Sequence, residues 1–353
     1  MKVGFSTEGQ RNNCATASRV YQIDPRGARR YSPILRVLFL AGLFFALSPQ
    51  CGWAAKYSRH LQEVPFRLFG NHFVVITGSL GESASRHLLI DTGTNPSVVD
   101  RETAQELGLQ EIAGQSMDVY VMNATVHTHL AVLPNVTFGP VRRQRIVVTV
   151  ADLSWLRRLA GIRIDAVIGL DVLDQLKFQI DYSSRKMKFG DVAMSGTKVP
   201  ITEIDRLLMV AAQVNGTKVN LMVDTGGSSI VLFPDGIPKG SWETAPGPAA
   251  KISNWAGEGV VQQMEVEHLL LGDRDLGPSL VVMLNKPPSQ NVQGILGISA
   301  RRFRRITFDL GHSQAAFELR ETSADSMDAP VSCEAIVGFA ACYGTRAPPN
   351  STR

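Results

Sequence analysis

Short apolar runs rich in β-branched residues make up most of the chain from residue 64 onward, and Gly, Asn or Pro separates them. Two examples are HFVVITGSL at 72–80 and QRIVVTV at 144–150. Strands of this length, with turn residues between them at short intervals, are typical of closed or folded β architectures. The pattern therefore predicts an all-β protein.

One segment departs from this pattern. RETAQELGL at 101–109 has helical spacing and ends near Gly108, which predicts one short helix. The equivalent place later in the chain reads FPDGIPKG at 233–240, where Pro234 and Pro238 exclude a helix interior.

The chain contains an internal duplication. LLIDTGTNPSVV at 88–99 matches LMVDTGGSSIVL at 221–232, and the two aspartates, Asp91 and Asp224, are 133 residues apart. Further blocks match in the same order with offsets of 128 to 135: 64–65 with 199–200, 136–139 with 269–272, 166–169 with 294–297, and 178–189 with 306–317. We infer a duplicated unit of about 125 residues.

The blocks divide the chain into four parts. We expect a leader at 1–54, an N-terminal lobe at 55–197, a C-terminal lobe at 198–320 and a flexible tail at 321–353. Within the tail, Cys333 and Cys342 either close a small ring in an oxidising compartment or stay two unpaired thiols.

The leader contains an apolar run, VLFLAGLFFAL at 37–47, that follows a group of arginines. The run is too short to cross a bilayer as a helix, and its layout is that of a secretory signal peptide. Gly52-Trp53-Ala54 predicts cleavage after Ala54, and the mature chain is then exported, periplasmic or secreted, without a stable membrane span. The alternative is an uncleaved N-terminal segment that tethers the protein to the membrane.

Composition adds two exclusions. The 353 residues are 44% hydrophobic and 19% charged, which is globular composition, and the formal net charge is +4. Residues 1–55 hold seven Lys and Arg against two acidic residues, or +5, which leaves −1 for the remainder and predicts no nucleic-acid partner. Four cysteines without a CxxC pair predict no metal site.

Asp91 and Asp224 carry the candidate chemistry. Each ends an apolar strand and precedes Thr-Gly, a tight turn whose backbone N–H groups can point at the carboxylate. Two such turns meeting at a pseudo-twofold axis would bring the carboxylates together, so that the pair shares one proton. A water held between them would then contact one general base and one general acid.

These motifs resemble the aspartic proteases of the retropepsin/pepsin superfamily, and most closely the retropepsin-like enzymes of bacteria. The resemblance covers about 63–320 and rests on IDTGT at 90–94, VDTGG at 223–227, and the apolar-apolar-Gly elements at 167–169 and 295–297. It implies a bilobal acid-protease fold: two tandem β-barrel lobes related by a pseudo-twofold axis, with a central cleft between them.

The resemblance also implies the roles of the site residues. Asp91 and Asp224 would be the catalytic pair, and Thr92 and Thr225 would hydrogen-bond across the axis. Thr94 keeps a hydroxyl beside the first aspartate, whereas Gly227 departs from the Ser or Thr usual in pepsin-like members. The expected supporting residues are therefore Thr92, Gly93, Thr94, Thr225, Gly226 and Ser228, the last as a substitute hydroxyl.

Members of the superfamily cover the cleft with a β-hairpin flap. The candidate flap is 115–131, with its turn near Asn123 and with Tyr120 and Met122 facing substrate. In the second unit, 253–261 is the equivalent segment, and Trp255 is its candidate substrate contact.

The sequence thus predicts a monomeric aspartic endopeptidase that acts on peptides or proteins without a metal or other cofactor. An alternative is a catalytically silent peptide-binding module of the cell envelope on the same fold. A third hypothesis is an envelope structural protein in which the Asp-Thr-Gly turns are only turns.

Overall fold

The computed structural model describes residues 60–121, 124–237, 245–254, 257–320 and 334–336. All of them belong to one compact unit, Tyr57–Arg353. The predicted leader, Met122, Trp255, Cys333 and Cys342 lie outside the described residues. Strands account for 59% of the structure and helices for 9%, which confirms the predicted all-β, two-lobed fold.

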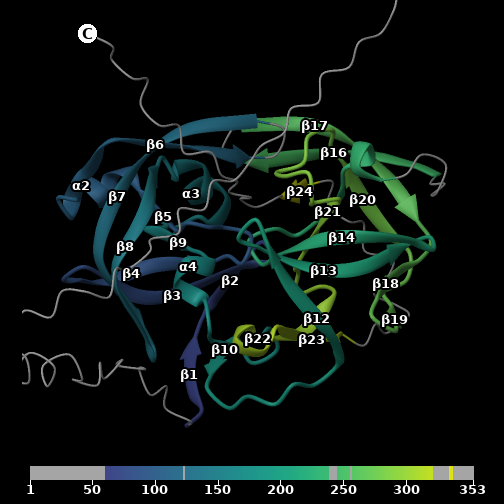
Figure 1. The fold of residues 1–353 in the computed structure, drawn as a ribbon, viewed down its shortest axis with the longest axis horizontal. Helices are drawn as coiled ribbons and strands as arrows, with labels where there is room; N and C mark the ends of the chain where they lie inside the picture. The colour runs from purple at the N-terminus through teal and green to yellow at the C-terminus, as the bar shows by residue number, and fades with distance from the viewer. Residues whose placement is uncertain (1–59, 122–123, 238–244, 255–256, 321–333, 337–353) are drawn as a thin grey trace, which may run out of the picture. The chain divides into compact units, whose positions relative to one another are not determined.

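The first sheet is built from the first half of the chain, in the order β2-β3-β4-β9-β5-β8-β7-β6 (Figure 1). Its strands are β2 (Arg67–Phe69), β3 (Phe73–Leu80), β4 (Ser83–Ile90), β5 (Val98–Asp100), β6 (Glu111–Val121), β7 (Ala124–Phe138), β8 (Val141–Ala151) and β9 (Ala166–Ile168). Three short helices interrupt them: α2 (Arg101–Glu106), α3 (Ser154–Ala160) and α4 (Leu170–Leu173).

The second sheet has the order β1-β11-β10-β22-β23-β12-β13-β14-β21-β15-β20-β17-β16-β24, and β18 and β19 pair off this path. The first half of the chain supplies β1 (Gln62–Pro65), β10 (Lys177–Asp181) and β11 (Lys186–Phe189). The other strands are β12 (Thr197–Ile204), β13 (Leu207–Val214), β14 (Thr217–Asp224), β15 (Ile230–Leu232), β16 (Ala245–Asn254), β17 (Gly257–Val266), β18 (Leu269–Leu271), β19 (Arg274–Asp275), β20 (Ser279–Met283), β21 (Gly294–Gly297), β22 (Phe303–Asp309), β23 (Gln314–Leu319) and β24 (Glu334–Ile336).

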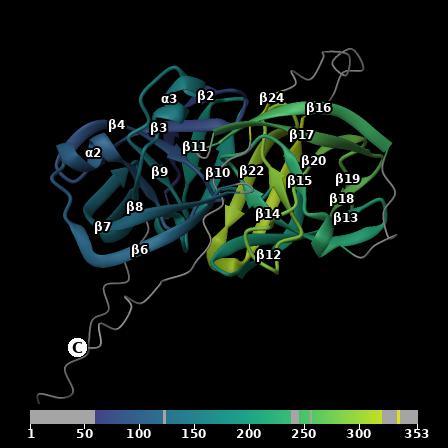
Figure 2. The same ribbon diagram turned by 90° about the horizontal axis from the view of Figure 1, so that it is seen from above.

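Antiparallel pairing of β10 with β22 joins the two halves. Phe178 of β10 stacks on Phe308 of β22, with ring centroids 5.0 Å apart, and both side chains are fully buried. Beside them, the Gln179 amide donates to the Thr307 hydroxyl at 2.8 Å. Figure 2 shows β10 and β22 side by side at the middle of the ribbon. The hydrophobic core is therefore continuous from one half to the other.

The pairings repeat between the halves as the duplication predicts. β4 pairs in parallel with β9, and β14 pairs in parallel with β21. β5 pairs antiparallel with β9 and in parallel with β8. In the second half, β15 pairs antiparallel with β21 and in parallel with β20. Each half also projects a long hairpin, β6–β7 or β16–β17.

The predicted helix is present as α2. The Asp100 carboxylate caps it by accepting from the Thr103 amide at 3.4 Å, and the chain leaves the helix at Gly108, whose φ is +62°. The equivalent segment contains only a 3₁₀ turn, η1 (Pro234–Gly236), because proline cannot continue a helix. A second 3₁₀ turn, η2 (Leu310–His312), connects β22 to β23.

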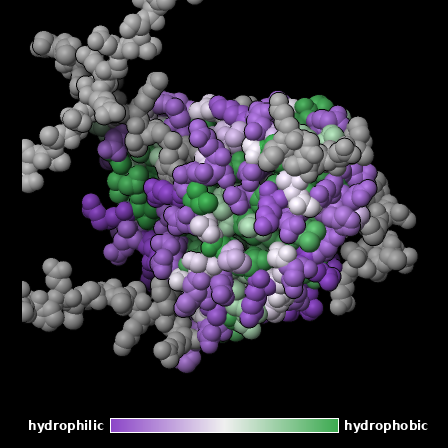
Figure 3. All heavy atoms as spheres, turned by 45° about the vertical axis from the view of Figure 1, so that its right-hand side comes forward, coloured by the Kyte–Doolittle hydropathy of each residue, from purple (hydrophilic) through white to green (hydrophobic). Residues whose placement is uncertain are grey.

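The face shown in Figure 3 is mostly hydrophilic, with hydrophobic residues in small separate patches. Among the described residues, only four large hydrophobic side chains are exposed: Leu61, Val132, Val147 and Val260.

No helix among the described residues has the length and apolar character needed to span a membrane.

Candidate active site

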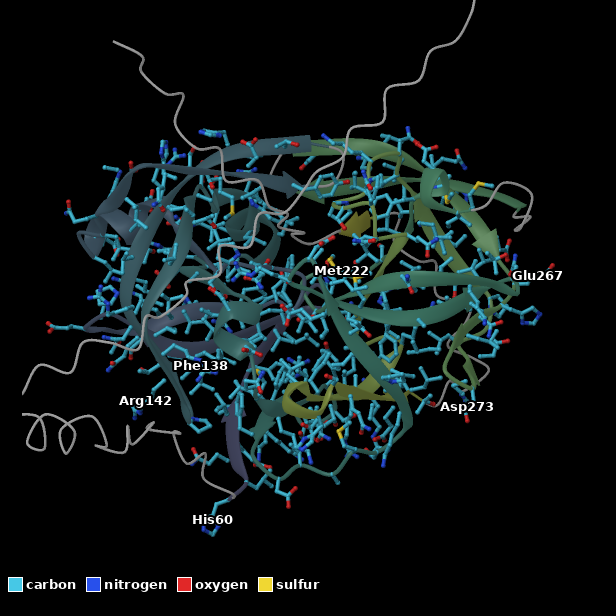
Figure 4. All side chains as sticks on the ribbon, viewed as in Figure 1. His60, Phe138, Arg142, Met222, Glu267 and Asp273 are labelled. Atoms are coloured by element: carbon cyan, nitrogen blue, oxygen red, sulfur yellow. The ribbon has the colours of Figure 1, made fainter. Side chains whose placement is uncertain are left out.

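The two aspartates lie at the ends of matching strands. Asp91 directly follows β4, and Asp224 is the last residue of β14. Both side chains are fully buried. In Figure 4, Met222, two residues before Asp224, lies near the middle of the ribbon, far from the peripheral Asp273. The site therefore sits at the junction of the halves.

Two threonines tie the aspartate turns together. The Thr92 amide donates to the Thr225 hydroxyl oxygen at 3.0 Å, and the Thr225 amide donates to the Thr92 hydroxyl oxygen at 3.2 Å. Each hydroxyl in turn donates to a backbone carbonyl of the other half: Thr92 to Val223 at 2.8 Å and Thr225 to Ile90 at 3.1 Å. All four bonds are buried, so they hold the turns in one relative position.

Glycine at 226 permits the close approach of the two turns. A Cβ atom at Gly226 would lie 2.5 Å from Cγ of Asp91, a separation that real Cβ atoms do not show. The Asp91 carboxyl group therefore packs directly on the second turn, next to Asp224. Any side chain at this position would push the carboxyl groups apart.

The apolar-apolar-Gly elements pass directly behind these turns. A Cβ atom at Gly169 would overlap the carbonyl of Thr94, and one at Gly297 would overlap the carbonyl of Ser229. In return, the Leu170 amide donates to the Thr94 carbonyl at 2.9 Å, and the Ile298 amide donates to the Asp224 carbonyl at 2.9 Å. Glycine is required here because one backbone packs against another.

The two carboxyl groups have different partners. Asp91 accepts from the Gly93 amide and from the Thr94 hydroxyl, both at 2.7 Å. Asp224 accepts from the Gly226 amide through Oδ1 at 2.8 Å. Its Oδ2 is buried and accepts from no N–H or hydroxyl group of the described residues, and the Asp224 side chain hydrogen-bonds to that of Asp91. Asp91 is the better stabilised carboxylate.

Burial raises the pKa of both carboxyl groups, because water no longer stabilises the charged form. For Asp91, the Thr94 hydroxyl and the amides of the turn act against this rise. For Asp224, the charge of Asp91 adds to burial and raises the pKa well above its ordinary value. Within this coupled pair, the pKa of Asp224 is therefore raised more than that of Asp91.

In the hairpin β6–β7, Val121 pairs with Ala124, and the predicted turn residue Asn123 lies outside the described residues. Tyr120, the candidate substrate contact, is 4% exposed. Its ring packs among Met209, Met222 and Ile252 of the second half, and its hydroxyl donates to the carbonyl of Lys286. The physical reason is that a large apolar ring is more stable in this buried cluster than in water.

Sequence reasoning missed the residues that support the first turn. The Asp171 carboxylate accepts from the Ser97 hydroxyl at 2.6 Å and from the Ser97 amide at 3.0 Å. The Ser97 hydroxyl also accepts from the Gly169 amide at 2.9 Å. Asn95 crosses to the other half, where its amide donates to the carbonyl of Arg206 at 3.0 Å. The segment Asn95-Pro96-Ser97 directly follows IDTGT at 90–94, and this adjacency is the sequence feature that could have identified Asn95 and Ser97 as supporting residues.

Comparison with known families supports the same site. The aspartyl protease family matches the chain over residues 76–172 and again over 210–300, so each matched region contains one Asp-Thr-Gly turn and one apolar-apolar-Gly element. None of the curated proteins compared with the chain matches it. The two matched regions together cover more than half of the chain, and the chain therefore belongs to the aspartyl protease family.

Proposed function

We propose that this chain is an aspartic endopeptidase of the retropepsin-like type, in which Asp91 and Asp224 share a proton and activate water. The observation that carries the proposal is the buried junction in which each half supplies one carboxyl group and Thr92 and Thr225 lock the turns together. A single chain supplies both aspartates, which supports a monomeric enzyme without a cofactor.

The unequal surroundings of the carboxyl groups assign their roles. Asp91, the anion, removes a proton from the attacking water as the water oxygen bonds to the scissile carbonyl carbon. Asp224 gives its proton to the carbonyl oxygen, which yields a neutral gem-diol. Collapse of this intermediate breaks the C–N bond as the leaving nitrogen takes the proton now held by Asp91, and the diol proton returns to Asp224.

Substrate reaches the aspartates when the hairpins move, since both carboxyl groups are fully buried in the structure described. We assign Tyr120 as a substrate contact once β6–β7 lifts away from Lys286. Met122 and Trp255 are proposed contacts on the basis of sequence alone.

The leader supports a location for the protein outside the cytoplasm. The short apolar run at 37–47 and the small residues at 52–54 support export, with the mature protein periplasmic or secreted. N-terminal sequencing of the protein made in a cell with a working export pathway is expected to begin at residue 55. A sequence beginning at residue 1 would favour the membrane-tethered alternative.

The decisive experiment is digestion of a peptide library by the mature chain across acidic to neutral pH. We expect Asp91→Asn and Asp224→Asn each to lower kcat/KM by about 10³-fold, and pepstatin to inhibit the wild type. Asp273→Asn, an exposed aspartate at a peripheral turn, is the matched control and should retain full activity. Peptide binding without turnover at every pH would instead identify a silent binding module.

A further inference from the structure

The C-terminal tail contributes a strand to the second sheet. Residues Glu334–Ile336 form β24, which pairs in parallel with β16 in the register Lys251↔Glu334, Ile252↔Ala335 and Ser253↔Ile336. β17 occupies the opposite edge of β16, with Ile252 facing Gly259. Figures 1 and 2 both show β24 beside β16. The tail therefore covers an edge of β16 that would otherwise end the sheet.

This edge belongs to a strand whose side chains pack in the same buried cluster as Met222 of β14, the strand that ends at Asp224. The side chains of Ala250 and Ile252 are 1% and 6% exposed and pack in the same cluster as Tyr120 and Met222. Met222 precedes Asp224 by two residues on β14, and Tyr120 belongs to the hairpin of the first half. The strand that receives β24 thus contacts both the opposite hairpin and the strand that carries an aspartate.

An uncovered edge strand presents unpaired N–H and C=O groups, and an extended peptide can pair with them whatever its sequence. We propose that this edge of β16 binds the substrate backbone as an added strand, and that residues Glu334–Ile336 occupy it in cis as a tethered competitor. The inference rests on the proposed peptidase function and adds a binding edge and an autoinhibitory segment to it.

A tethered competitor is effective because its concentration at the site is fixed by the covalent link. Fourteen residues, 320–333, join β23 to β24, and a segment on a tether of this length has an effective concentration of about millimolar. A free peptide at micromolar concentration then competes poorly. The tail lowers the apparent affinity for substrate without altering the chemistry at Asp91 and Asp224.

The test uses the full mature chain with Ala335→Pro, because proline at the middle residue of β24 has no N–H group and disfavours strand pairing. Ala341→Pro, in the same tail but outside the paired residues, is the matched control. We expect hydrogen exchange of the backbone amides at 251–253 to be about tenfold faster in Ala335→Pro than in the wild type, and unchanged in Ala341→Pro. Equal exchange in all three proteins would overturn the docking of the tail.

A second measurement addresses the edge as a binding site without requiring turnover. A fluorescein-labelled peptide of residues 331–339, with Cys333 replaced by Ser, is titrated against each protein. We expect it to bind Ala335→Pro about tenfold more tightly than the wild type or Ala341→Pro. Equal binding by all three proteins would show that the tail does not block the edge, and would overturn the proposal.

Kinetics then separates this inference from the proposed function. We expect Ala335→Pro to lower KM for a library peptide about tenfold with kcat unchanged. If KM is unchanged while exchange and peptide binding respond, the β16 edge is not where substrate binds, and that part of the proposal fails. If no variant cleaves any peptide, the peptidase function fails, and exchange and binding still decide whether the tail docks.

Discussion

Thr94 and Gly227 occupy equivalent positions in the two aspartate turns, and the Thr94 hydroxyl donates to Asp91 Oδ2 at 2.7 Å while Gly227 has no side chain to offer Asp224. This single difference between duplicated halves distinguishes two otherwise similar carboxyl groups. A hydroxyl that donates to a carboxylate stabilises the charged form. The two turns therefore make the same backbone hydrogen bond to their aspartates, but only Asp91 also accepts from a threonine hydroxyl.

Thr94→Val removes that hydroxyl without changing the size of the side chain much. A hydrogen bond to a charged group is worth about 1.5–3 kcal/mol, so the acid limb of the pH profile of kcat/KM should move up by about one to two pH units. Thr94→Ser keeps the hydroxyl and should leave the limb in place. An acid limb that does not move in Thr94→Val would contradict the assignment of Asp91 as the anion.

Asp224→Asn tests the raised pKa through stability. The folded protein holds this proton more tightly than the unfolded chain does, so the aspartate favours folding at low pH and this contribution is lost as pH rises. Asparagine cannot ionise, and Asp224→Asn should therefore be more stable than the wild type in urea at pH 7. The gain should vanish near pH 3. A variant that is less stable than the wild type at pH 7 would argue against a buried coupled pair.

Thr92→Val tests the cross-connection between the halves. The substitution leaves the buried Thr225 amide without its acceptor and the Val223 carbonyl without its donor. We expect a loss of about 1–3 kcal/mol in the free energy of unfolding, measured in urea. Thr92→Ser should recover most of it. Combining Thr92→Val with Thr225→Val should cost less than the two single losses together, because both remove parts of one network.

His72 should make the protein sensitive to acid. Its side chain is fully buried, and burial lowers its pKa from 6.5 to about 4. The unfolded chain binds this proton at higher pH than the folded protein, so stability is lost as pH falls from 6.5 towards 4. The loss attributable to His72 is about 3 kcal/mol. Urea titrations should show a flatter pH dependence in His72→Gln over this range, and equal slopes would contradict the prediction.

Tyr120→Phe tests how the first hairpin is held down. The ring stays in its apolar cluster, but the hydroxyl no longer donates to the Lys286 carbonyl. One neutral hydrogen bond is worth about 1 kcal/mol, so hydrogen exchange at the end of β6 should become about fivefold faster. Tyr120→Ala, which also loses the packing, should exchange faster still. Unchanged exchange in both variants would show that the hairpin is held elsewhere.

Sequence reasoning located the aspartate turns because their determinants are local. Within each five-residue turn, the aspartate carboxylate accepts from the backbone amide of a glycine two residues later, as Asp91 does from Gly93 and Asp224 does from Gly226. The duplication then predicted that two such turns meet. The fold class followed from the strand pattern for the same reason, since alternation and turn residues act over a few positions.

Contacts between residues distant in sequence escaped prediction. Nothing local to Tyr120 indicates a partner at Lys286, 166 residues away, and an aromatic residue near a hairpin tip suits a substrate contact equally well. The burial of His72 depends on how the turn after β2 packs, which composition does not reveal. Likewise, pairing of three tail residues with β16 depends on a free strand edge that exists only after folding.

The strands shared across the halves have a mechanical consequence. From β1 to β12, six neighbouring strands drawn from both halves of the chain form one continuous hydrogen-bonded sheet region. Separating the two lobes would break the hydrogen bonds between β10 and β22 and the stacking of Phe178 on Phe308. For the proposed peptidase, we therefore expect the two lobes to keep one relative position while substrate enters past the hairpins β6–β7 and β16–β17.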